Sequence, residues 1–318
     1  MKLILSISGG GIRGLIPAIV LKEIESCTGK RISDMFDLIS GNSTGGIIAC
    51  LLSVPDENHK PKYSAESVVK MYEEFGKKVF SRTFFRKILS LDGLISTKYS
   101  EKPLEKLLKQ YFGDIRLEKA CTNLLIPAYK ISHIPYPFFF KTHHAKNSKK
   151  DKENPYLWQC ARATSAASSY FKPYYFDRTN TFIDGGIFAN NPSLCAYAQA
   201  KKQWKNEKII LVSLGTGKNT KGFSYDKIKN WGLIQWAIPY FQQTSLSADD
   251  TVDNILKTMT SANGDAYYFI QTELEEKALT IDDSSDENLK RLETAAERLI
   301  VRKRHTIDEI CSLILMNT

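Results

Sequence analysis

Short apolar runs alternate along this chain with longer segments whose apolar residues recur at helical spacing. Six apolar runs predict strands, at Lys2–Ser8, Phe36–Ser40, Leu124–Ile131, Pro137–Lys141, Lys208–Leu214 and Tyr267–Gln271. Helical spacing follows the first run, a second helix is expected to open over Ile47–Leu52, and two further helices are predicted at Ser64–Val79 and Glu287–Arg302. This alternation predicts an α/β fold with a largely parallel sheet covered by helices.

Two glycine-rich turns follow the first two predicted strands. The first, GGGIRG at 9–14, satisfies the pattern GxGxxG and therefore raises the alternative of a dinucleotide site. That site also needs an acidic residue at the end of the second strand, whereas Asp37 falls at the start of that strand. The sequence thus lacks the acidic residue that a dinucleotide site needs in addition to the glycine-rich turn.

The second turn, GNSTG at 41–45, places Ser43 between a strand and a helix. A serine in this GxSxG context is typical of a nucleophile elbow, and the helix that begins just after it directs unpaired N–H groups at the site. Acyl transfer also needs donors for the developing oxyanion, which the backbone of Gly9, Gly10 and Gly11 can supply. Arg13 either adds a cation there or forms a structural salt bridge.

A nucleophilic serine needs a base, and the histidines are poor candidates. Four of them precede Asp184, against the Ser, Asp, His order of α/β-hydrolases, and the fifth lies in the basic segment RKRH; they are His59, His133, His143, His144 and His305. Asp184 follows an apolar strand end and precedes two glycines. An everyday turn explains this motif when it is considered alone.

Composition narrows the class of partner. The net charge of +9 favours anionic partners, and because no nucleic-acid-binding motif is present, a lipid surface ranks above a nucleic acid polymer. Six isolated cysteines without a histidine cluster argue against disulfides and a metal site. No apolar run is long enough to span a membrane, so we expect a cytoplasmic protein with peripheral membrane contact.

Taken in order, the motifs resemble the patatin-like phospholipase family. The matching blocks are Ser8–Gly14, Gly41–Gly45, Ala161–Ala167 with Tyr170–Pro173, Asp184–Gly186 and Ser213–Gly217. One departure is Ser8, which stands where plant patatins carry an aspartate. The resemblance covers residues 2–217 and leaves 218–318 as a variable end of one catalytic domain spanning 1–318.

The resemblance implies a three-layer α/β/α fold and a Ser43/Asp184 dyad that hydrolyses fatty acyl esters, without a metal or cofactor, through an acyl-serine intermediate. It places Gly9, Gly10, Gly11 and Arg13 at the oxyanion hole, with Gly14, Gly41, Gly45, Gly185 and Gly186 as supporting glycines. The implied substrate is a phospholipid or another acyl lipid. Acyl transfer to another acceptor, a regulated bacterial membrane-degrading effector, and a non-hydrolytic lipid-binding protein stay open as alternatives.

Two segments suggest how a lipid surface is reached. Residues 77–89 have a basic amphipathic pattern suited to an anionic membrane, although packing into the core explains it equally well. Residues 231–241 are aromatic and suit either a lid or more core. A homodimer and an unidentified activating ligand are left open by the sequence.

Overall fold

A mixed sheet organises the computed structural model, which describes residues 1–79, 97–148, 150, 153–219 and 222–317. Its eight described strands are β1 (Lys2–Ile7), β2 (Leu38–Gly41), β3 (Asn123–Lys130), β4 (Tyr136–Lys141), β5 (Tyr174–Asp177), β6 (Asn180–Asp184), β7 (Ile209–Leu214) and β8 (Ala266–Ile270). They are ordered β5-β6-β3-β2-β1-β7-β8, with β4 pairing β3. The five strands from β3 to β8 in this order are parallel, whereas β4, β5 and β6 pair antiparallel.

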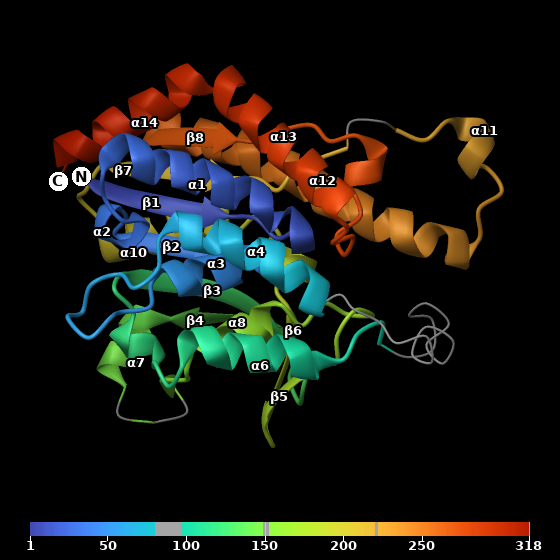
Figure 1. Ribbon diagram of the computed structural model, residues 1–318, viewed down its shortest axis with the longest axis horizontal. Coiled ribbons are helices and arrows are strands. Elements are labelled where there is room, and N and C mark those ends of the chain that lie inside the picture. The colour runs from blue at the N-terminus through green and yellow to red at the C-terminus, as the bar shows by residue number, and fades with distance from the viewer. Residues whose placement is uncertain (80–96, 149, 151–152, 220–221, 318) are drawn as a thin grey trace.

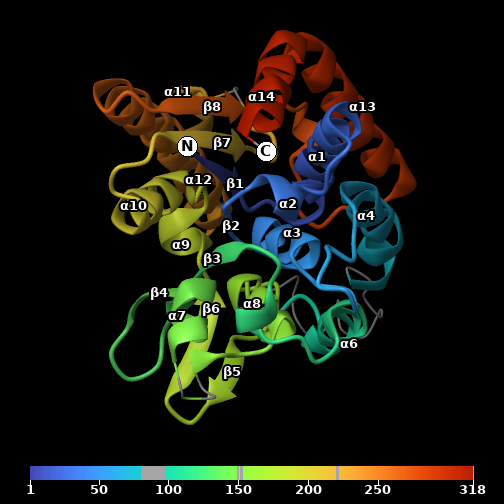
Figure 2. The same cartoon turned by 90° about the vertical axis from the view of Figure 1, so that its left-hand side faces the viewer.

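Helices cover both faces of this sheet, as Figures 1 and 2 show. One face carries α1 (Leu15–Thr28), α3 (Thr44–Leu52), α4 (Ala65–Val79), α6 (Glu101–Phe112), α8 (Leu157–Thr164), α13 (Asp286–Arg302) and α14 (Arg304–Asn317). The other face carries α10 (Ser193–Gln203) and α12 (Leu233–Ala262). The expected three-layer α/β/α fold with a mostly parallel sheet is therefore confirmed.

Shorter helical segments connect these layers. They are η1 (Gly11–Gly14), α2 (Ile32–Met35), η3 (Leu117–Lys119), α7 (Thr142–Asn147), α9 (Gly186–Ala189), α11 (Tyr225–Ile228) and η5 (Glu276–Ala278). Two of them lie beside the glycine-rich motifs, since η1 follows the first glycine run and α9 follows Asp184.

The core explains why the strands are apolar throughout. Along β1, Leu3, Leu5 and Ile7 point into the larger cluster beneath α1 and α3, while Ile4 points into the smaller cluster beneath α10. Side chains alternate between the two faces of a strand, so a strand buried on both faces needs a continuous apolar run.

The predicted strands are confirmed to within two residues at each end. The apolar pattern placed the start of α3 at Ile47, whereas the helix begins at Thr44, directly after Ser43 as the elbow motif predicts. Because glycine has low helix propensity, Gly45 and Gly46 did not indicate the first turn of α3. The β5–β6 hairpin was also not predicted as a whole, since its strands are short and half polar; only the apolar end of β6 before Asp184 was expected.

The described residues do not show whether either segment proposed to contact lipid lies at the surface or in the core. Most of 77–89 lies outside the described residues; 231–241 enters α12 at Leu233, but most of its side chains lie outside them too. Within the described part of the chain, no helix is long and apolar enough to cross a membrane.

The glycines of the GxSxG motif let three elements approach closely at the end of the sheet. A Cβ on Gly41 would collide with the Gly45 carbonyl, and a Cβ on Gly45 would collide with the carbonyl oxygen of Ile7. The start of α3 therefore lies directly on the ends of β1 and β2, which brings the two glycine-rich turns together.

We expect Gly45→Ala to lower the free energy of unfolding by about 1–3 kcal/mol, because the added methyl group meets backbone that cannot move aside. Urea denaturation monitored by circular dichroism measures this loss. Gly222→Ala is the matched control, since no atom lies within 4 Å of a Cβ there. Equal effects of the two substitutions would show that close backbone approach does not constrain the elbow.

Candidate active site

Ser43 occupies a strained elbow between β2 and α3. Its φ of 53° and ψ of −121° lie outside the regions that residues with a Cβ prefer. The backbone N–H of Ser43 donates to Thr164 Oγ1 at 3.0 Å, and its carbonyl accepts from Ile47 N at 3.0 Å. These bonds hold the strained residue in place and leave its side chain partly exposed.

Asp184 lies at the end of β6, opposite Ala128 of β3, and only 8% of its surface is exposed. Its carboxylate accepts hydrogen bonds from the Ser43 side chain, the Gly186 N–H at 2.7 Å and Asn42 Nδ2 at 3.1 Å. The structure thus brings together the two residues that the sequence proposed as nucleophile and base.

The environment of Asp184 changes its proton affinity. Burial raises the pKa of the carboxyl from 3.8 to about 6, and the three hydrogen bonds oppose this rise only in part. A carboxylate with a pKa near 6 is a stronger base than an ordinary aspartate and is still ionised at neutral pH.

Two residues of this site were missed at the sequence level. Asn42 is fully buried and bridges the motifs, because its Nδ2 donates to Asp184 while its Oδ1 accepts from Thr164 Oγ1 at 3.4 Å. Thr164 ends α8 and also receives the Ser43 N–H. The signals were present, since Asn42 adjoins the nucleophile and Thr164 belongs to the ARATSAA block, but neither pattern specifies a hydrogen-bond partner.

The glycine loop after β1 presents fewer free donors than expected. The Gly9 N–H already donates to the Asn190 carbonyl at 3.0 Å, so it is not available to an oxyanion. The N–H groups of Gly10 and Gly11 donate to no acceptor among the described residues. Of the three glycine N–H groups expected to bind the oxyanion, only those of Gly10 and Gly11 are therefore available.

Arg13 binds the protein's own backbone. Its Nε donates to Gly10 O and its Nη1 to Gly217 O, both at 3.4 Å. Burial lowers its pKa to about 10, and the nearby Asp249 carboxylate opposes this shift. These contacts favour the structural interpretation of Arg13, as a brace between the glycine loop and the turn after β7.

The supporting glycines make room for contacts around the two motifs. Gly14 leaves space for the hydrogen bond between Thr44 and Tyr72. A Cβ on Gly185 would lie 2.7 Å from Asn42 Oδ1, and a Cβ on Gly186 would lie 3.0 Å from Asp184 Oδ1. Side chains here would displace the residues that surround the carboxylate.

The histidines lie away from the Ser43–Asp184 pair. All five are described and exposed, and none forms a recorded contact with Ser43 or Asp184. His305 lies on α14, His133 pairs with the Arg178 carbonyl, and His144 pairs with Glu153. In the described part of the chain, no group of three or more His, Cys, Asp or Glu residues could hold a metal ion.

A small apolar cavity of about 60 Å³ opens beside Ser43. It lies between the glycine loop and the helices that cover this face, and its lining includes Ile12, Ile47, Leu104 and Phe171. Ser43, the candidate nucleophile, thus lies between the hydrogen-bond network around Asp184 and this apolar cavity.

Comparisons with known proteins show which family this chain resembles. Residues 5–196 match the family described as patatin-like phospholipase. Patatin-like protein 2 of Oryza sativa subsp. indica is 31% identical over 350 aligned residues, which cover 97% of this chain and 86% of the rice protein. The protein named probable inactive patatin-3-Kuras 1 of Solanum tuberosum is 29% identical, with 94% of this chain and 86% of the potato protein covered.

Among solved structures, VipD from Legionella pneumophila aligns with a TM-score of 0.40 and 13% identity, over 92% of this chain and 67% of VipD. The family match spans more than half of the 318 residues, and the rice relative extends the similarity over nearly the whole chain. The chain therefore belongs to the patatin-like phospholipase family.

Proposed function

We propose that this protein is a lipid acyl hydrolase in which Ser43 is the nucleophile and Asp184 the general base. The observation that carries this proposal is the hydrogen bond from the Ser43 side chain to a buried carboxylate whose pKa is raised to about 6. A base that contacts the nucleophile and is oriented by a further group, here Asn42, meets the geometric requirement for an activated serine.

In the proposed reaction, Ser43 Oγ attacks the ester carbonyl carbon while its proton passes to Asp184. When the tetrahedral intermediate collapses, the C–O bond to the alcohol breaks and Asp184 returns the proton to the leaving oxygen. Asp184 then takes a proton from water, whose oxygen attacks the acyl-enzyme, and the fatty acid leaves as Ser43 recovers its proton. No oxidant, metal or cofactor is needed for this sequence.

The glycine loop supports the charge that develops in both steps. The N–H groups of Gly10 and Gly11 are donors that engage no acceptor among the described residues. Fixed backbone donors of this kind stabilise an oxyanion without reorganising during the reaction. We assign the oxyanion hole to these two residues, with Arg13 as a brace for the loop.

The apolar cavity beside Ser43 suits the acyl chain. Its volume of about 60 Å³ is well below the roughly 300–1,000 Å³ typical of ligand pockets, so a long chain requires the surrounding helices to separate. Short acyl esters therefore fit this form of the protein better than long ones.

A non-hydrolytic lipid-binding role is the second candidate, because one relative is named a probable inactive patatin. Hydrolysis is the stronger proposal, since Ser43, Asp184 and the free glycine donors are all present in this chain. The two candidates differ in whether fatty acid is released.

We expect Ser43→Ala and Asp184→Asn each to lower kcat/KM by a factor of about 10³ or more, because each removes a group that takes part in proton transfer. The measurement is fatty-acid release from phospholipid vesicles and from p-nitrophenyl butyrate. His305→Ala is the matched control and should retain activity. Loss of activity in His305→Ala would replace the dyad with a triad, whereas a wild type that is inactive on every ester would favour lipid binding.

The pH dependence of kcat/KM should report the proposed base. Asp184 must be ionised to accept the Ser43 proton, and its folded-state pKa is raised to about 6, so activity should increase as pH rises through about 6 and level off above it. Initial rates on p-nitrophenyl butyrate in buffers of constant ionic strength give this profile. A profile that stays flat down to the ordinary aspartate pKa of about 3.9 would contradict the assignment.

A further inference from the structure

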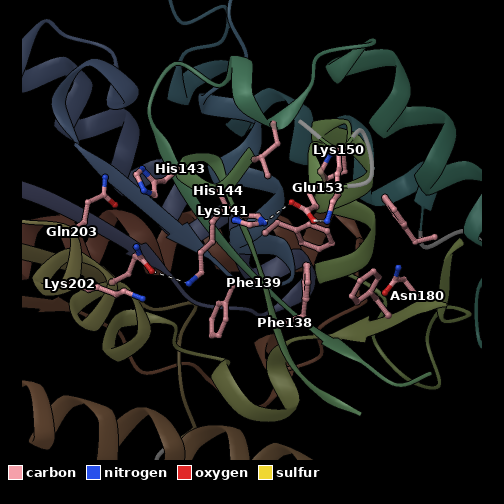
Figure 3. A pocket seen from close by; sticks show the side chains of 16 residues that line it. Phe138, Phe139, Lys141, His143, His144, Lys150, Glu153, Asn180, Lys202 and Gln203 are labelled. Atoms are coloured by element: carbon pink, nitrogen blue, oxygen red, sulfur yellow. Dashed lines mark hydrogen bonds and ion pairs between the residues drawn. The ribbon is translucent and has the colours of Figure 1, made fainter. Parts of the chain in front are cut away.

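A second, larger cavity lies at the edge of the sheet, around β4. Its volume is about 910 Å³, and it shares no lining residue with the cavity beside Ser43. Among the described strands, β4 pairs only with β3, so its other edge is unpaired. Figure 3 shows side chains of β4, α7 and α10 pointing into this space.

One part of the cavity holds two lysines without an acidic partner. Lys141 ends β4 and donates from Nζ to Gln199 Oε1 at 3.0 Å, and Lys202 approaches it from the last turn of α10 (Figure 3). Neither lysine forms an ion pair with any described residue, and the proximity of Lys202 helps to lower the pKa of Lys141, after the larger effect of burial. Two like charges brought together in this way create a site for an anion.

The acidic residue in the lining does not neutralise these lysines. Glu153 already accepts from Ser148 Oγ at 2.5 Å, contacts His144 Nε2 at 3.1 Å and forms an ion pair with Lys150 at 3.4 Å. Its charge is therefore compensated locally, and the positive charge of Lys141 and Lys202 remains unbalanced.

The remaining wall of the cavity is aromatic. Phe139 lies beneath Lys141, whose Nζ is 5.5 Å from the ring centroid, and it packs edge-on against Phe188. On the opposite face of β4, the rings of Phe138, Phe140 and Phe182 form a cluster with centroids 4.9–5.3 Å apart. Phe139 is only half-buried, so apolar surface is available beside the cationic pair.

We propose that this cavity binds an amphiphilic anion, with a carboxylate or phosphate head between Lys141 and Lys202 and an aliphatic chain over Phe139 on the same face of β4. The head would balance the positive charges of the two lysines, and the chain would cover the exposed part of the Phe139 ring. A volume of about 910 Å³ lies within the range that encloses most of a small ligand. The site is separate from the proposed hydrolysis, because its lining includes neither Ser43 nor Asp184.

The test uses full-length Ser43→Ala protein, so that no ester chemistry intervenes, with isothermal titration calorimetry. Dodecanoate and dodecyl phosphate, below their micelle-forming concentrations, are the two anionic probes. Dodecyl maltoside tests the chain without the charge, and inorganic phosphate tests the charge without the chain. We expect both anionic probes to bind, with affinity at least about tenfold higher than that of either control ligand.

Adding K141Q/K202Q should weaken binding of both anionic probes by about tenfold or more, because it removes charge-assisted hydrogen bonds to the head group. K146Q/K205Q is the matched control, since it removes the same charge from two exposed lysines outside the cavity. Thermal unfolding checks that both variants are folded. Hydrogen exchange should slow in β4 and α10 when dodecanoate binds.

Each other outcome would overturn the proposal. Equal affinities of K141Q/K202Q and K146Q/K205Q would show that the lysine pair does not bind the head group. Binding without slower exchange in β4 and α10 would place the ligand elsewhere, for example beside Ser43. Inorganic phosphate binding as tightly as dodecyl phosphate would reduce the site to a simple anion site. Binding by only one of the two anionic probes would show that the lysine pair does not recognise the charge that the two head groups share.

Discussion

The structure around the Ser43 elbow depends on the buried negative charge of the Asp184 carboxylate. Asp184 is nearly inaccessible to solvent, yet its carboxylate is stabilised by donors from Ser43, Asn42 and Gly186. Removing these donors would leave a buried charge unpaired, which is among the costliest defects in a folded protein. The residues that hold Asn42 and Gly186 in position, including Thr164, are thus part of the same electrostatic arrangement.

Much of the fold could be predicted because its signals are local. Buried parallel strands need continuous apolar runs, and those runs located β1, β2, β3 and β7 closely. The apolar pattern placed the start of α3 too late because Gly45 packs closely against β1 and Gly46 against Gly41 and Thr164, which a propensity argument does not detect. The β5–β6 hairpin was missed because half of its residues are polar or exposed.

The candidate site could be predicted only where a motif specifies chemistry. Ser43 and Asp184 stand in recognisable patterns, and the structure places them in contact. The bond from the Gly9 N–H to Asn190 and the bridge through Asn42 are long-range contacts, which require the register of several strands to be known. The same applies to Lys141 and Lys202, which come together only because β4 and α10 are adjacent in the folded chain.

The backbone of Ser43 has a consequence for how sequences in this family can change. A left-handed φ of 53° is costly for serine and free of cost for glycine, so the fold itself exerts no pressure to keep a hydroxyl at this position. The presence of serine here is therefore consistent with the proposed chemistry of its hydroxyl, and replacing Ser43 need not disturb the scaffold. A relative with glycine at this position would keep the elbow without strain and would lose only the hydroxyl.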